Sequence, residues 1–125
     1  MRPLALLLLT LGAASCGGGG STAPAPLPNP TNPFTFTITS AGVAPKEFTV
    51  SPGTRVLFVN NDSRRHDIAS DPHPEHDDCT EINSVGVLNP GQRRETGNLV
   101  AQRTCGVHDH DNPNNESLKA RIIIR

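Results

Sequence analysis

Aromatic residues and methionine are scarce in this sequence. The chain of 125 residues has four Phe, no Trp and no Tyr. Aromatic side chains often dominate the area buried in a core, so a core here must consist mostly of Val, Ile and Leu. The single methionine is Met1, which excludes a thioether from any site elsewhere in the chain.

The sequence also lacks an excess of charge of either sign. Lys and Arg together number 11, Asp and Glu number 12, and the formal net charge is −1 at pH 7 with neutral histidines. Domains that bind nucleic acid usually carry a clustered basic surface, so this balance argues against a nucleic-acid partner. Heptads and convincing amphipathic-helix patterns are missing too, which disfavours a helical fold.

Long hydrophobic runs are also missing. The most apolar stretch lies near the N-terminus and is short. Arg2 precedes an apolar run from Leu4 to Leu11, and small residues follow. This pattern is typical of a secretory signal peptide. The run is shorter than the roughly 20 apolar residues that a membrane-spanning helix needs. We therefore predict a signal peptide over residues 1–15.

The predicted signal peptide ends in the sequence AASC, at Cys16. This resembles the lipobox of bacterial lipoproteins, which implies cleavage before Cys16 and lipidation of that cysteine. The expected location is the bacterial cell envelope, lipid-anchored to a membrane and facing the periplasm or the exterior. Ordinary secretion, with Cys16 as a spare thiol, is the alternative.

The predicted tether covers residues 16–33, which are rich in Gly and Pro. Such a composition gives a flexible start and a stiffer, extended end. The folded part is then residues 34–125, roughly 90 residues and one small domain. A domain of this size buries a modest core, so a disulfide or a metal would add useful stability.

Short strands separated by turn signals are predicted throughout this domain. We expect strands within 34–40, 46–53, 54–62 and 66–70, two more between Pro90-Gly91 and Cys105, and a last one in 118–125. Leu118, Ile122 and Ile124 share one face of the last strand by their spacing. Residues 71–89 form a long polar loop. This pattern predicts an antiparallel sandwich or barrel.

Two stretches resemble the cupredoxins, especially the plastocyanin-like group. The first, KEFTVSPGTRVLFVNNDSRRHDI (46–68), has a Pro-Gly turn, a hydrophobic strand, an Asn-Asn pair and then His66. The second, RTCGVH (103–108) with LKARIII (118–124), is similar to the family's Cys-x-x-His, loop and final strand. The resemblance implies an all-β, Greek-key β-sandwich over residues 34–125.

The resemblance also implies a type 1 copper site, in which two histidines and a thiolate form a trigonal plane with a weak axial ligand. His66 and His108 match the histidines, and Cys105 matches the thiolate. Cys105 would end a strand, and His108 would lie on the loop after it. Asn61 is expected to hydrogen-bond behind the ligands, tying the His66 loop to the Cys105 loop.

The axial ligand departs from the family pattern. No methionine is available, and alignment of the last strand places Leu118 at the axial position. Family members with leucine there keep a three-coordinate site of raised potential. The loop between His108 and Leu118 is also longer than usual.

The segment DPHPEHDDC (71–79) is a second departure, because it adds His73, His76 and Cys79. If Cys16 is lipidated, Cys79 and Cys105 remain as an even pair in an oxidising space. A disulfide between them would remove the thiolate ligand.

An all-nitrogen copper or zinc site is the alternative in that case. Its ligands would be His66, His108 and His110, joined by His73 or His76. The sequence leaves the thiolate and the disulfide both open.

Three functions follow from these alternatives. The first is a single-electron carrier that cycles copper between Cu(I) and Cu(II) and passes electrons to a redox protein partner. The second is a copper-binding or copper-delivery module, and the third is a metal-free interaction domain stapled by Cys79 and Cys105. No nucleophile–base pair is evident, so we expect no enzyme activity. We also expect a monomer.

Overall fold

The structure is a computed structural model, and it describes residues 31–125. The predicted signal peptide, Cys16 and nearly all of the tether lie outside the described residues. Asn32, inside the predicted tether, donates hydrogen bonds to the Arg55 carbonyl and the Glu95 carboxylate. Within residues 31–125, no helix is long and apolar enough to span a membrane.

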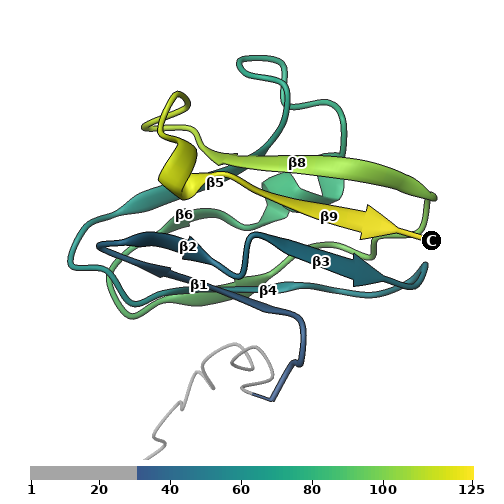
Figure 1. The fold of residues 1–125 in the computed structure, drawn as a ribbon, viewed down its shortest axis with the longest axis horizontal. Coiled ribbons are helices and arrows are strands. Elements are labelled where there is room, and N and C mark those ends of the chain that lie inside the picture. The colour runs from purple at the N-terminus through teal and green to yellow at the C-terminus, as the bar shows by residue number, and fades with distance from the viewer. Residues whose placement is uncertain (1–30) are drawn as a thin grey trace, which may run out of the picture.

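Two β-sheets pack face to face and form a sandwich (Figure 1). The strands are β1 (Thr35–Thr39), β2 (Gly42–Ala44), β3 (Glu47–Val50), β4 (Leu57–Asn60), β5 (His66–Ser70), β6 (Gly86–Leu88), β7 (Arg93–Glu95), β8 (Arg103–Asp109) and β9 (Ala120–Ile124). Two short 3-10 helices, η1 (Thr80–Ser84) and η2 (Glu116–Leu118), interrupt the loops. The predicted all-β sandwich is therefore confirmed.

The strand order places β1 and β9 inside their sheets. One sheet has the order β2-β1-β4-β7, and the other has the order β3-β9-β8-β5-β6. The pairs β1–β4 and β3–β9 are parallel, so both sheets are mixed rather than purely antiparallel as the sequence predicted. Sequence periodicity sets the face of each side chain but not the direction of its neighbouring strand.

Aliphatic side chains supply most of the core, as the scarcity of aromatics predicted. Ile122 and Ile124 of β9 are buried, and so is Leu118 just before it. Phe36 and Phe58 pack against each other, with ring centroids 5.0 Å apart. The predicted apolar face of the last strand is thus confirmed, and it faces the other sheet.

Some strand predictions were wrong. β2 lies where a turn was expected, and β6 lies inside the predicted long loop. Both have only three residues, too few for alternation to appear in the sequence. β8 continues through Asp109, four residues past Cys105. That last difference decides where the histidines lie.

Candidate metal centre

Four histidine rings gather on the outer face of the five-stranded sheet. One ring nitrogen from each of His73, His76, His108 and His110 lies within 4.8 Å of the others. His73 and His76 come from the loop after β5, His108 from β8, and His110 directly follows β8. Figure 1 shows the loop after β5 and the loop between β8 and β9 rising on the same side of β8.

His108 is the buried member of this cluster, with 1% of its surface exposed. Its Nδ1 lies 2.6 Å from Oδ1 of Asp71. Its Nε2 is the one buried side-chain nitrogen or oxygen without a hydrogen-bond partner among the described residues. A buried polar atom left without a partner destabilises a fold, and a bound cation would satisfy this one.

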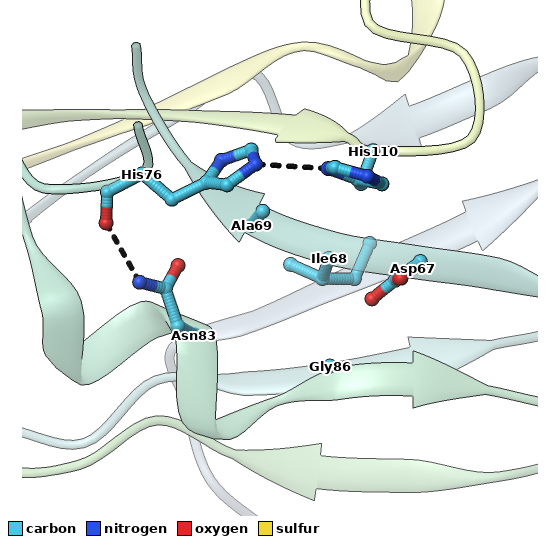
Figure 2. Close-up of a pocket in the computed structure, with 7 residues that line it drawn as sticks. All are labelled: Asp67, Ile68, Ala69, His76, Asn83, Gly86 and His110. Atoms are coloured by element: carbon cyan, nitrogen blue, oxygen red, sulfur yellow. Dashed lines mark hydrogen bonds between the residues drawn. The ribbon is translucent and has the colours of Figure 1, made fainter. Parts of the chain in front are cut away.

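His76 and His110 face each other, as Figure 2 shows. Nε2 of His76 lies 2.8 Å from Nδ1 of His110. Nδ1 of His76 donates to the Ser70 carbonyl at 2.9 Å. Because that bond uses the Nδ1 proton, a neutral His76 ring keeps its Nε2 lone pair directed at His110.

The backbone of His76 is held in an uncommon conformation. Its φ is +57°, in the left-handed region that non-glycine residues seldom adopt. The Asn83 side chain donates to the His76 carbonyl at 2.7 Å (Figure 2). The His76 N–H donates to the Pro72 carbonyl at 2.7 Å. Such strain persists only where the surroundings enforce it, and it is frequent at functional sites.

His73 completes the cluster from the solvent side. Its ring lies 5.0 Å from that of His110 and 5.4 Å from that of His76, measured between centroids. Desolvation lowers the pKa of His73 first, and the neighbouring histidines lower it further. A lowered pKa keeps the imidazole neutral, which is the form that binds metals.

A depression of about 270 Å³ opens beside the His76–His110 pair. Figure 2 shows its lining, with Ala69 between the two histidines and Asp67 at the far side. Solvent and ions therefore have access to the cluster from this side.

Cys105 is not a thiolate, so its prediction as a copper ligand was wrong. It forms a disulfide with Cys79, and both residues are fully buried. The alternative disulfide that the sequence left open is confirmed. It fixes the loop that carries His73 and His76 to the strand that carries His108.

The Cys-x-x-His spacing does not bring Cys105 and His108 together. Because β8 continues past both residues, their side chains point to opposite faces of the sheet. Cys105 pairs with Ile122 on the core face, whereas His108 pairs with Ala69 on the outer face. A shared site would require the strand to end at Cys105, as the sequence had predicted.

His66 also lies on the core face, so the structure does not place it with the other histidines. Its Nδ1 lies 2.8 Å from Asp109 and its Nε2 lies 3.0 Å from Asp62. This geometry suits the doubly protonated ring, whose two N–H groups both donate to carboxylates. The bond from His66 is the main cause that lowers the pKa of Asp62.

The expected roles of Asn61 and Leu118 were wrong. Asn61 is exposed and bonds through its backbone N–H to Ile38. The neighbouring Asn60 is buried instead, and its side chain donates to the carbonyls of Arg64 and Leu88, which links the β4–β5 turn to the end of β6 and not to the Cys105 segment. Leu118 packs in the core, and the disulfide leaves no thiolate–copper site to which it could be axial.

Comparisons with known proteins support the fold. No protein-family model and no curated protein matches the chain. An amicyanin from Paracoccus versutus matches with a TM-score of 0.60 at 14% identity, covering 78% of this chain and 85% of the amicyanin. A purple cupredoxin from Nitrosopumilus maritimus matches with a TM-score of 0.53 at 16% identity, covering 73% of this chain and 98% of the cupredoxin. Plastocyanin from Dryopteris crassirhizoma matches with a TM-score of 0.55 at 15% identity, covering 73% of this chain and 99% of the plastocyanin. The chain therefore has a cupredoxin-like fold.

Proposed function

We propose that this protein is a copper-binding module that holds Cu(II) with the imidazoles of His73, His76, His108 and His110. The carrying observation is the convergence of four ring nitrogens within 4.8 Å. Imidazole nitrogen suits copper and zinc, and copper(II) binds such sites more tightly than zinc does. Two nitrogens that are each about 2 Å from one shared ion lie about 3 Å apart, near the His76–His110 separation of 2.8 Å.

The chemistry of this site favours copper capture or delivery over thiolate-tuned electron transfer. The disulfide leaves no sulfur ligand in the cluster. Three of the four histidines are at least partly exposed, so an ion has direct access. We assign the protein a binding role and no enzyme activity.

The surrounding charge supports the capture of a cation. Exposed carboxylates lie on the same two loops as the histidines: Glu75, Asp77, Asp78 and Asp111. Local negative charge raises the concentration of cations near a site and speeds their association.

The proposed location is the bacterial cell envelope, with a lipid on Cys16 and the domain facing the periplasm or the exterior. The signal-peptide pattern supports export, and a buried disulfide is usual in an oxidising compartment. A copper-accepting or redox protein of the envelope is the proposed partner.

Titration with Cu(II), followed by calorimetry, visible absorption and electron paramagnetic resonance, tests this function. We expect one ion per chain, a weak absorption band and hyperfine splitting from nitrogen ligands. His108→Ala and His110→Ala should each weaken binding more than the 10–100-fold typical of losing a residue that only supports a ligand. Asn114→Ala, on an exposed neighbouring residue, is the matched control and should bind as the wild type does.

Two results would contradict the proposal. Absence of saturable binding would leave a disulfide-stapled domain whose role is interaction. An intense blue band would mean that Cys105 is a free thiolate that binds copper.

A further inference from the structure

Asp71 lies against the outer face of β8, beside the histidine cluster. Its Oδ1 is 2.6 Å from Nδ1 of His108. Its own backbone is fixed on both sides, because its N–H donates to Gly106 at 3.0 Å and its carbonyl accepts from Asp78 at 3.0 Å. The Ser70 hydroxyl also donates to that carbonyl at 2.8 Å. The carboxylate is thus held in place by its backbone and not only by its contact with His108.

We propose that Asp71 is the positioning residue of the site, and that it selects the tautomer of His108 that can bind a metal. This inference rests on the proposed function of the cluster. A carboxylate only accepts hydrogen bonds, so the neutral His108 ring must carry its proton on Nδ1. The lone pair is then on Nε2, which is the buried atom without a partner.

Gly106 provides the space that this arrangement needs. It lies two residues before His108 on the same face of β8. A Cβ at this position would come within 1.8 Å of Oδ2 and 2.6 Å of Cγ of Asp71. Any other residue would therefore displace the carboxylate from His108. A glycine inside a strand is often found where another group approaches the backbone closely.

The first test measures the tautomer of His108 in the metal-free protein. Long-range ¹H–¹⁵N spectra at pH 8 distinguish a protonated ring nitrogen from an unprotonated one. In the wild type we expect the proton on Nδ1 of His108. In Asp71→Ala and in Gly106→Ala, we expect a large part of the population to carry it on Nε2. An unchanged Nδ1–H form in both variants would overturn the inference.

The second test measures copper affinity in the same variants. Loss of a group that orients a metal-binding histidine typically lowers affinity 10–100-fold, and we expect this for Asp71→Ala and for Gly106→Ala. The double variant should bind copper no more weakly than Asp71→Ala does, because both substitutions remove the same contact, the one between Asp71 and His108. Circular dichroism verifies that each variant is folded.

Asp77→Ala is the matched control for charge. Asp77 is exposed in the same loop, and no hydrogen bond links it to a histidine within the described residues. We expect Asp77→Ala to lose only a small electrostatic share of the affinity, about twofold, because no contact with a histidine is removed. An equal loss in Asp77→Ala and Asp71→Ala would overturn the inference, since general electrostatic attraction would then explain both.

The two tests separate this inference from the proposed function. If the wild type binds no copper, the proposed function fails, and the tautomer measurement still decides whether Asp71 positions His108. If the wild type binds copper and Asp71→Ala binds it equally well, the function stands and the inference fails.

Discussion

At the scale of single residues, His66 shows that a residue can match a family's motif and still lack the role that the motif position has in that family. The residue that the resemblance assigned to copper instead joins two buried carboxylates on the core face. Both ring nitrogens are used, so neither is available to a metal. A buried charge needs partners of opposite sign, and His66 is the partner that Asp62 and Asp109 share.

We therefore predict that His66→Ala destabilises the fold and leaves copper affinity intact. Removing one partner from a buried ionic network typically costs about 3–5 kcal/mol, because the remaining charges lose their compensation. Urea unfolding measures the stability, and calorimetry at a temperature where the variant is folded measures the affinity. His73→Ala is the reciprocal control: an exposed residue whose loss should weaken copper binding with little effect on stability. Retained stability in His66→Ala would contradict the ionic network.

Asp62 gives the protein a specific dependence of stability on pH. The hydrogen bond from His66, helped by Ser63 and Arg64, lowers the pKa of Asp62 from its ordinary value of 3.8. A lowered pKa in the folded chain means that the ionised carboxylate stabilises the fold above the unfolded-state pKa. This contribution is lost as the pH falls through the lower, folded-state pKa.

We expect Asp62→Asn to be less stable than the wild type at pH 7. The difference should begin to shrink below about pH 4, where the carboxylate of the unfolded chain starts to bind a proton, and it should disappear once the pH is below the lowered pKa of the folded chain. Unfolding by urea at a series of pH values from 3 to 7 gives both curves. A difference that stays constant across this range would show that the charge of Asp62 contributes nothing.

At the scale of elements, the disulfide and β8 together build the site. Cys79 ends the segment that carries His73 and His76, and Cys105 precedes His108 in β8. The disulfide therefore joins the segment that carries His73 and His76 to the strand that carries His108. The loop begins at Asp71, which lies against Gly106 on the outer face of β8, and it returns to the core at Cys79, so His73 and His76 lie between these two points.

Removal of this disulfide should weaken both stability and copper binding. Closing a loop of 26 residues corresponds to about 3.5 kcal/mol in the chain-entropy description. We expect the double variant Cys79→Ala, Cys105→Ala to lose stability of about this size. Copper affinity should fall as well, because the loop that carries His73 and His76 is no longer fixed.

Thermal unfolding and copper titration of this double variant check the prediction, and thiol titration of the unfolded wild type verifies that the disulfide exists. Wild-type protein treated with reductant should behave as the variant does. Unchanged copper affinity in a folded variant would show that the hydrogen bonds of the loop suffice to hold its histidines.

At the scale of the whole molecule, the proposed copper site lies on the outer face of one sheet, and not at the positions of His66 and Cys105 that the family resemblance implied. The fold is cupredoxin-like, but a fold does not fix the position of a site. Residues with the family's spacing, Cys105 and His108, are divided between the two faces of β8. The four clustered histidines lie instead on the outer face of the five-stranded sheet, where the loop after β5 meets the end of β8.

Much of the fold was predictable from the sequence because alternation and turn residues are local signals. The strands β1 and β9 were found by their alternation, β4 by its apolar run and β3 by the Pro52-Gly53 turn that closes it. The aliphatic core followed from the scarcity of aromatics. The sequence also indicated His73, His76 and His110 as possible ligands. The short strands β2 and β6 have too few residues to show alternation. The parallel pairings join strands that lie far apart in the sequence, so no local pattern revealed them.

The sequence by itself determined the inventory: a domain without an internal methionine, two cysteines that can pair, and five histidines of which four fall in two short segments. It also determined the sandwich, because residues that alternate every second position must bury one face. The tertiary structure alone decided which histidines meet. That outcome depends on β8 continuing past Cys105, which places His108 on the face of the sheet opposite to Cys105. It also depends on Gly106, which leaves room for the Asp71 side chain. Both are consequences of how distant segments pair and pack, and neither is written in local spacing.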